Sequence, residues 1–444
     1  MPSRRDFVLF TASSAALLSI GVPALAHDGS GKVLQATAVT QVFGNGIRLS
    51  AVAVEFDLPI QGTDLPLSSF QVAGRSVTAV YTSSSADPAD RAAVGRFVII
   101  ALSPDDLGAA LANRSAARPP ERANPQASTA DGPPRGASET SYKLALAAVM
   151  QATPVTASDG TVIAADQMAI ATTDVKNLIV DDFKQLEFHD PKTGDKLKYN
   201  LFTPANYDAA KSYPLVLFMH DAGATSSVTQ TTLWQGLGAI AWASPTDQAQ
   251  RPCFVLAPQY EDLIANDKSQ TTSMLDTTID LLQTLTRQYS IDSKRLYATG
   301  QSGGCMMSIA MNIAYPDLFA ASFLVAGQWD PALVKPLARK KLWILVSQDD
   351  NKAFPGQNAI TAALEKEGAK ISRATWDGTW TQKQFRLAFD KMAAENSPIN
   401  YVAFRAGTVI PAGESTAGAA GHMNTWRIAY TIEPIREWIF RQTA

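Results

Sequence analysis

Cysteine is scarce in this chain, because Cys253 and Cys305 are the only two among 444 residues. Two cysteines cannot hold together a disulfide-stabilised scaffold, so the hydrophobic core has to supply the stability of the fold. Cys253 opens an apolar run, whereas Cys305 follows a glycine-rich turn in another part of the chain. We therefore expect two free, buried thiols.

A surplus of charge is also absent. The 38 Lys and Arg residues nearly balance the 41 Asp and Glu residues, which leaves a formal net charge of -3. This balance gives no electrostatic attraction to nucleic acid or to an anionic membrane surface, and it favours small or neutral ligands. The length of 444 residues favours two domains, each long enough to bury a core.

Motifs for metals and cofactors are missing as well. The four histidines, His27, His189, His220 and His422, are far apart, and no His-Glu-x-x-His, Cys-x-x-Cys or calcium-loop spacing occurs. The glycine-rich stretch GQSGG lacks the spacing and the lysine of a phosphate-binding loop. We predict neither a metal nor a cofactor.

Long apolar runs are absent after the N-terminus, so no later segment is expected to span a bilayer. The chain begins with twin arginines, Arg4 and Arg5, a short apolar run rich in Ala and Ser, and an Ala-Leu-Ala cleavage pattern at 24–26. A membrane anchor is the alternative, but these features favour a cleaved twin-arginine-type signal peptide over residues 1–26. We expect the mature protein to begin near His27 and to be periplasmic or secreted, without attachment to the membrane.

Residues 27–181 show the pattern of an all-β domain. Strict alternation after a Gly-Asn-Gly turn places Val52, Val54 and Phe56 on one face of a strand, and further short strands with turns between them follow. This pattern predicts an immunoglobulin-like β-sandwich. The segment 113–139 is crowded with Pro, Ala, Arg and Ser, and we predict a disordered surface loop there.

Residues 182–444 have a different sequence pattern, in which apolar runs alternate with helical stretches. A hairpin is expected around Lys192-Thr193-Gly194. Six nearly continuous apolar runs follow, which is typical of strands buried on both faces, and stretches with helical spacing separate them. The runs are YPLVLFMH, CFVLAPQY, RLYATG, ASFLVAG, KLWILVS and INYVAFRA. We predict an α/β domain with a mainly parallel sheet flanked by helices.

One serine is surrounded by glycines between a predicted strand and a predicted helix, in the stretch RLYATGQSGGCMMSIAM. Gly-x-Ser-x-Gly at such a joint forms a sharp turn that exposes the serine hydroxyl above the sheet. The start of the helix also supplies backbone N–H groups and a positive dipole end for a developing oxyanion. Ser302 is therefore a candidate nucleophile.

A serine nucleophile needs a base, and the scarcity of histidine limits the choice. In this kind of fold the chain order is serine, acid, histidine, and only His422 follows Ser302. We expect His422 in a glycine-rich loop before the C-terminal helix. For the acid, Asp349 and Asp350 both follow a predicted strand directly, and the residues alone do not choose between them.

The turn after another strand, His220-Asp221-Ala222-Gly223, has small residues that let backbone amides point at a substrate oxygen. We expect Gly303 to give one N–H group to an oxyanion hole and Ala222 to give the second, with Asp221 as the alternative to Ala222. His220 is expected to hold this turn by hydrogen bonds and to take no part in proton transfer.

With these motifs, the chain resembles exported esterases of the α/β-hydrolase fold that carry an N-terminal immunoglobulin-like domain. These are relatives of polyhydroxybutyrate-depolymerase-like and feruloyl-type esterases and, more distantly, of prolyl-oligopeptidase-like hydrolases. The resemblance implies Ser302 as nucleophile, His422 as base, Asp350 as acid, and the N–H groups of Ala222 and Gly303 as oxyanion hole. At position 221 this chain differs from the family pattern, because it has aspartate where many relatives have glycine.

We therefore expect an exported serine hydrolase that cleaves small-molecule or polymeric carboxylic esters through an acyl-enzyme intermediate. A prolyl-oligopeptidase-like peptidase and a non-catalytic binding protein are the alternatives. Three roles are open for the N-terminal domain, namely shading the active site, forming a homo-oligomer and binding an insoluble polymer.

Overall fold

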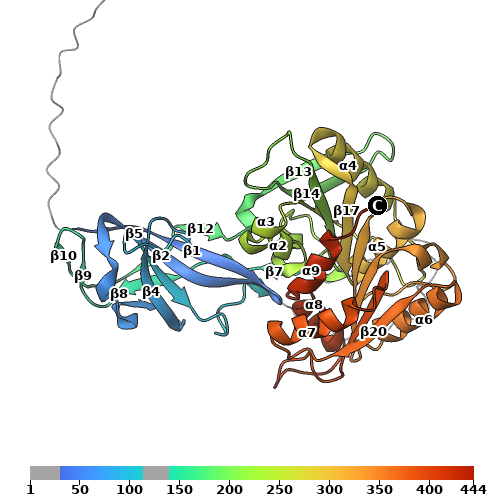
Figure 1. Cartoon of the computed structure of the whole chain (residues 1–444). Helices are drawn as coiled ribbons and strands as arrows, with labels where there is room; N and C mark the ends of the chain where they lie inside the picture. Colours follow the sequence, from blue (N-terminus) through green and yellow to red (C-terminus); the bar gives the residue numbers. More distant parts are fainter. Residues whose placement is uncertain (1–30, 114–139) are drawn as a thin grey trace, which may run out of the picture.

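The computed structural model describes residues 31–113 and 140–444. The predicted signal peptide, residues 1–26, lies outside the described residues, as does the predicted loop 113–139 except for its first residue, Asn113, which belongs to a short strand. Figure 1 shows two lobes, an all-β lobe built from the first part of the chain and a larger lobe of helices around a sheet.

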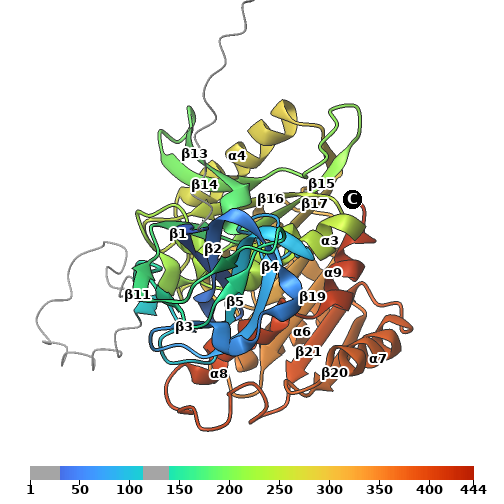
Figure 2. The same ribbon diagram turned by 90° about the vertical axis from the view of Figure 1, so that its left-hand side faces the viewer.

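The N-terminal lobe is built from two main sheets, which Figure 2 shows in front of the larger lobe. The five-stranded sheet has the order β12-β1-β2-β5-β4 and the three-stranded sheet the order β11-β8-β3. Their strands are β1 (Val33–Phe43), β2 (Gly46–Gln61), β3 (Phe70–Val72), β4 (Val77–Ser83), β5 (Val94–Leu102), β8 (Ala148–Gln151), β11 (Asp166–Ala171) and β12 (Asp174–Asn177). Two short ladders join β6 (Ala112–Asn113) to β7 (Ser141–Tyr142) and β9 (Val155–Thr156) to β10 (Val162–Ile163).

Strand β2 buries residues on both faces of its sheet, and the predicted alternation holds on one of them. Val52, Val54 and Phe56 are buried in the main core, as predicted. The residues between them, Ala51 and Ala53, are also buried, in a second small cluster on the other face of the sheet. The predicted all-β domain before an α/β domain is seen in the order of the elements along the chain.

The larger lobe contains one nine-stranded sheet of order β13-β14-β16-β15-β17-β18-β19-β21-β20. Every neighbouring pair from β16 to β20 is parallel, whereas β14 runs antiparallel to both β13 and β16. The strands are β13 (Phe183–His189), β14 (Lys196–Phe202), β15 (Tyr213–Met219), β16 (Phe254–Gln259), β17 (Ile291–Gln301), β18 (Ala321–Val325), β19 (Leu342–Ser347), β20 (Ile371–Trp376) and β21 (Ile399–Phe404). All six predicted apolar runs are strands of this sheet, and the predicted hairpin is the β13–β14 pair.

Helices cover both faces of this sheet (Figure 1). They are α1 (Thr231–Trp234), α2 (Leu237–Ala243), α3 (Pro245–Gln250), α4 (Met274–Gln288), α5 (Gly303–Ala314), α6 (Ala353–Lys366), α7 (Gln382–Ala393), α8 (Ala420–Ala429) and α9 (Glu433–Phe440). The central strands β15, β16, β18, β19 and β21 are buried along their whole length, because helices pack on both of their faces. Among the described residues, no helix has both the length and the apolar character needed to cross a membrane.

The two lobes touch through the turn between β1 and β2. A Cβ atom at Gly44 would lie 2.3 Å from the backbone oxygen of Arg427 on α8, so only glycine fits there. The Tyr142 ring packs edge-on against Trp234 of α1, with 4.9 Å between the ring centroids. The hydroxyl of Thr140 donates to the backbone oxygen of Gly223 over 3.1 Å. The N-terminal lobe therefore contacts segments that lead directly to the candidate site.

Candidate active site

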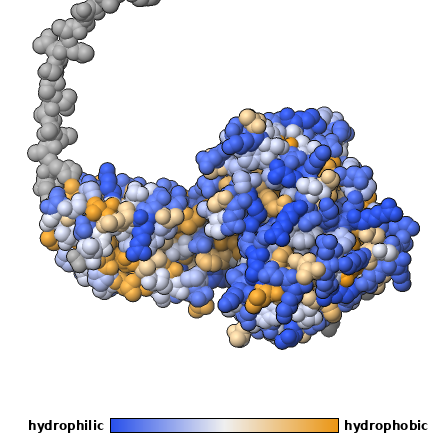
Figure 3. Space-filling model, in the orientation of Figure 1, coloured by the Kyte–Doolittle hydropathy of each residue, from blue (hydrophilic) through white to orange (hydrophobic). Residues whose placement is uncertain are grey.

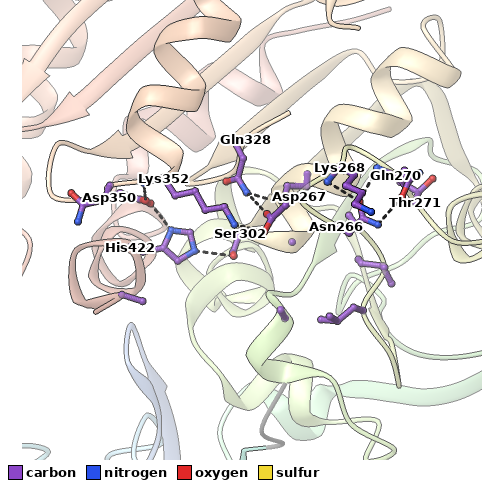
Figure 4. Close-up of a pocket in the computed structure, with 18 of the residues that line it drawn as sticks. Asn266, Asp267, Lys268, Gln270, Thr271, Ser302, Gln328, Asp350, Lys352 and His422 are labelled. Carbon is purple, nitrogen blue, oxygen red and sulfur yellow. Dashed lines mark hydrogen bonds and ion pairs between the residues drawn. The ribbon is translucent and has the colours of Figure 1, made fainter. Parts of the chain in front are cut away.

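The candidate site lies where parallel strands end. Strands β15, β17 and β19 point the same way, and their carboxyl ends lead into His220, Ser302 and Asp350 respectively. His422 comes from α8, after strand β21. Carboxyl ends of parallel strands share one edge of a sheet, which is where ligands bind in open α/β sheets. Figure 4 shows Ser302, Asp350 and His422 in one row along a pocket.

Ser302 occupies a strained turn between β17 and α5. Its backbone has φ 52° and ψ -117°, a conformation that L-residues rarely adopt. The flanking glycines are required, because a Cβ atom at Gly300 would lie 2.4 Å from the backbone of Gly304. A Cβ atom at Gly304 would lie 2.0 Å from the backbone oxygen of Met219. The turn therefore lifts the serine side chain above the sheet, as the glycine spacing predicts.

The hydroxyl of Ser302 and the imidazole of His422 are within hydrogen-bond distance. The Oγ atom of Ser302 lies 2.8 Å from Nε2 of His422, and Nδ1 of the same ring contacts Oδ2 of Asp350. Because the carboxylate accepts from Nδ1–H, Nε2 carries a lone pair that can accept the serine proton. The three predicted side chains are thus brought together in the order that nucleophilic catalysis requires.

Asp350 and its neighbour Asp349 have different partners. Asp350 is buried, and its Oδ1 atom accepts from the backbone N–H groups of Ala353 at 2.8 Å and Lys352 at 3.1 Å. Burial alone would raise the pKa of Asp350, but the hydrogen bonds from His422 and from these N–H groups outweigh it, and the pKa is lowered. Asp349 instead accepts from the N–H of Gly407 at 2.8 Å. The structure brings Asp350, and not Asp349, to His422.

His422 does not lie in a loop, so this part of the prediction was wrong. It lies in the first turn of α8, and the Trp426 ring one turn later packs edge-on against the imidazole at 4.8 Å. The helix begins inside the glycine-rich stretch, at Ala420, and includes Gly421. A helix holds the imidazole in a defined position, which a mobile loop would not.

The turn after β15 carries the predicted second oxyanion donor. The nitrogen of Ala222 lies 3.6 Å from the position of a Cβ atom at Gly303, so the N–H groups of both residues lie beside Ser302. The Nδ1–H of His220 donates to the backbone oxygen of Asp221 at 2.7 Å, and its Nε2 accepts from the N–H of Tyr260 at 3.0 Å. Burial lowers the pKa of His220, so the ring is neutral and structural, as predicted.

The bond from His220 has a directional consequence. In a trans peptide the C=O and N–H groups point in opposite directions. The C=O of Asp221 and the N–H of Ala222 belong to one peptide group. Because His220 holds the C=O on the buried side, the N–H of Ala222 is turned toward the pocket. Of the two donors left open by the residues, the geometry favours Ala222.

A pocket of about 1270 Å³ opens beside these groups. One wall is the segment 263–272, which was not predicted from the sequence. The carboxylate of Asp267 in this segment forms an ion pair with Lys352 and accepts from Nε2 of Gln328 at 3.0 Å (Figure 4). Asn266, Lys268 and Gln270 add further polar groups to the lining. The segment lacks a hydrophobic period and a known motif, so only the folded chain reveals its position.

Both thiols are buried and free, as predicted. Burial raises the pKa of Cys305 to about 12, so its thiol stays protonated beneath the serine turn. Within residues 31–113 and 140–444, no group of three or more His, Cys, Asp or Glu side chains is placed to hold a metal ion.

Comparison with known protein families matches both lobes. Residues 35–164 match the family described as "Esterase Ig-like N-terminal domain", and residues 191–408 match "Putative esterase". A crystal structure of a thermostable esterase superposes with a TM-score of 0.75 at 24% identity, covering 92% of this chain and 100% of that chain. This likeness in structure concerns the fold of both lobes together.

Curated relatives match over short segments only. A probable acetylxylan esterase A of Aspergillus flavus is 50% identical over 42 residues, which is 10% of this chain and 14% of that protein. Acetylxylan esterase A of Emericella nidulans is 44% identical over 55 residues, which is 12% of this chain and 16% of that protein. The chain thus spans less than a fifth of the length of these relatives.

Proposed function

Because the chain is a carboxylesterase whose α/β-hydrolase domain follows an immunoglobulin-like domain, we propose that Ser302, His422 and Asp350 form its catalytic triad. The observation that carries this proposal is the 2.8 Å approach of Ser302 Oγ to His422 Nε2, with Nδ1 of the same ring on Asp350. The contact of all three side chains supports catalysis over the alternative of a non-catalytic binding protein.

The geometry supports a two-step reaction. Ser302 Oγ attacks the carbonyl carbon of the ester while Nε2 of His422 takes its proton. The carbonyl oxygen becomes an oxyanion that the N–H groups of Ala222 and Gly303 stabilise. His422 then returns the proton to the alcohol oxygen as the bond to the carbonyl carbon breaks, which leaves the acyl group on Ser302. Water, activated by His422, releases the acid and restores the serine.

For the substrate we propose a small or polymeric ester whose alcohol part carries polar groups. Support comes from the 263–272 segment, whose Asn266, Asp267, Lys268 and Gln270 face the pocket beside Ser302 (Figure 4). A polar wall of this kind has further donor and acceptor sites for hydroxyl groups, and an alkyl alcohol has no group that can use them. The relatives named for acetylxylan act on an ester of such an alcohol.

A pair of acetate esters tests this proposal. We expect the acetate of a sugar alcohol to be hydrolysed with a kcat/KM about five- to thirtyfold above that of cyclohexyl acetate, since one or two hydrogen bonds contribute about 1 kcal/mol each. The two esters share their acyl group, so the comparison isolates the alcohol part. Equal values would contradict the polar-alcohol proposal, and faster cleavage of a peptide anilide than of either ester would favour the peptidase.

We also propose export by the twin-arginine route, which the Arg4-Arg5 pair and the cleavage pattern at 24–26 support. The expected result is that protein recovered outside the cytoplasm begins near His27, by N-terminal sequencing. Replacing both arginines by lysine preserves the charge and is expected to leave unprocessed protein in the cytoplasm. Recovery of the processed variant at wild-type levels would contradict this route.

A homo-oligomer through the N-terminal lobe stays a prediction. Figure 3 shows hydrophobic patches on the surface of that lobe, in one view, next to a more uniformly hydrophilic larger lobe. Most of the exposed large apolar side chains among the described residues precede residue 182, and they include Leu107, Leu144 and Met168. The same exposed apolar side chains could instead bind an insoluble polymer, which is another of the roles predicted for this lobe.

A further inference from the structure

The turn that carries the N–H of Ala222 is joined to the serine turn by side chains outside the triad. Asp221 stands before the short 3₁₀ turn η4 (Ala222–Ala224), and its Oδ1 atom accepts from the N–H of Gly223 at 2.7 Å. Its second oxygen, Oδ2, accepts from Nε2 of Gln301 at 2.9 Å. Gln301 is the last residue of β17, directly before Ser302, and it is buried.

We propose that Asp221 is a positioning residue, which fixes the N–H of Ala222 relative to Ser302 through its bond to Gln301. This inference rests on the proposed function, because it concerns the oxyanion hole of the same reaction. The two carboxylate oxygens have separate roles, since Oδ1 shapes the turn and Oδ2 fastens the turn to the neighbouring strand end. Hydrogen bonds to a carboxylate are stronger and shorter than those between neutral groups, which suits a link that has to hold a distance.

Two further contacts make this link rigid. The same Nε2 atom of Gln301 donates to Oε1 of Gln235 at 3.0 Å, so both of its hydrogens are used and its amide cannot rotate without losing a bond. His220 fixes the Asp221–Ala222 peptide on the buried side. The C=O of this peptide is bonded to the imidazole of His220, and the carboxylate of the same Asp221 is bonded to Gln301 and to the N–H of Gly223, so the N–H of Ala222 is held in one direction.

The chain of hydrogen bonds ends at the N-terminal lobe. Gln235 lies between Trp234, which packs on Tyr142, and Gly236, where a Cβ atom would lie 3.2 Å from the oxygen of Gly44. The hydroxyl of Thr140 contacts the oxyanion turn itself at the oxygen of Gly223. The N-terminal lobe thus supports the outer end of the link that starts at Asp221.

Replacement of Asp221 by asparagine separates the roles of its two oxygens. Asparagine keeps an oxygen for the N–H of Gly223 but places an NH₂ group against the NH₂ group of Gln301. We expect kcat to fall about tenfold with KM changed less than about twofold, a smaller loss than removal of a whole oxyanion donor. The inhibition constant of a trifluoromethyl ketone, whose adduct with serine carries the same oxyanion, is expected to rise by about the same factor.

A double-mutant cycle with Gln301→Met tests the link itself. Because both side chains act through one bond, the double variant is expected to lose about tenfold, not the hundredfold of two independent effects. Asp208→Ala is the matched control, since Asp208 caps a turn in the same way, accepting from the N–H of Ala210 at 2.9 Å, before the opposite end of strand β15. It is expected to keep wild-type kcat and inhibitor affinity.

Three outcomes separate this inference from its alternatives. Wild-type kcat and inhibitor affinity in Asp221→Asn, with Ser302→Ala inactive, would overturn the positioning role and leave the triad intact. A lower melting temperature without a change in inhibitor affinity would show that Asp221 serves stability only, and would also overturn it. If Gln301→Met does not fold, Asp221→Asn alone tests the positioning role, by whether kcat and the inhibition constant change by the same factor. Turnover by Ser302→Ala would instead refute the proposed function.

Discussion

Replacing Ser302 by alanine is expected to lower kcat for an acetate ester by about 10⁴-fold or more, because the acyl group then has no oxygen to which it can transfer. Binding is expected to change little, since the pocket wall at 263–272 and the N–H groups of Ala222 and Gly303 stay in place. The residual rate would come from the oxyanion hole acting on direct attack by water. Steady-state kinetics and titration with a non-hydrolysable ether analogue of the ester, which binds without forming an adduct, check both parts on the same preparation.

A matched control for this variant lies on the same strand. Ser290 precedes strand β17 just as Ser302 follows it, and its hydroxyl donates to the backbone oxygen of Ala209 at 2.6 Å. Ser290→Ala is therefore expected to keep wild-type kcat, because it sits at the opposite end of the strand from the pocket. Loss of activity in both variants would point to a general effect on the fold, and retention of activity in Ser302→Ala would refute the assigned nucleophile.

Replacing Asp350 by asparagine is expected to lower kcat by about 10³- to 10⁴-fold. An asparagine NH₂ group facing the ring makes Nδ1 the acceptor and puts the ring proton on Nε2, which then cannot take the proton of Ser302. The imidazolium formed during the reaction also loses its carboxylate partner. Asp349→Asn is the neighbouring control, since Asp349 bonds the loop at Gly407 and not His422, and we expect less than a tenfold loss there.

Acid titration gives this second prediction another readout. The pKa of Asp350 is lowered in the folded protein, so its ionised form stabilises the fold at every pH above the unfolded-state pKa of about 3.9. That contribution is lost as the pH falls through the lower, folded-state pKa. Asp350→Asn is expected to flatten the acid limb of the stability curve, measured by denaturant unfolding between about pH 5 and pH 3. An unchanged acid limb would contradict the assigned hydrogen bonds of Asp350.

The sequence predicted those parts of the site that depend on a rare residue or on a steric requirement. The glycines around Ser302 identify the serine turn, because side chains at 300 and 304 would overlap backbone. The scarcity of histidine identifies His422, because no other histidine follows the serine. Continuous apolar runs locate six strands, because strands covered by helices on both faces bury every residue.

Other parts could not be predicted because they depend on three-dimensional placement. Asp349 and Asp350 differ by one position, and only the turn after β19 decides which carboxylate reaches His422. Strand β20 was not predicted from the sequence, because its residues ISRATW do not form a continuous apolar run. They alternate between buried and more exposed positions, as expected for the edge strand of the sheet. The bonds from Gln301 to Asp221 and Gln235 join residues 80 and 66 positions apart, and no local pattern marks such partners.

Trapping the covalent intermediate would identify the nucleophile without relying on a loss of activity. Wild-type protein mixed with an excess of an activated acetate ester and quenched in acid during turnover is expected to carry one acetyl group, located by peptide mass spectrometry on Ser302. Ser302→Ala treated in the same way is expected to carry none, and Ser290→Ala is expected to behave as wild type. An acetyl group on another residue, or turnover of the ester by Ser302→Ala at the wild-type rate, would contradict the assignment of Ser302 as the nucleophile of this esterase.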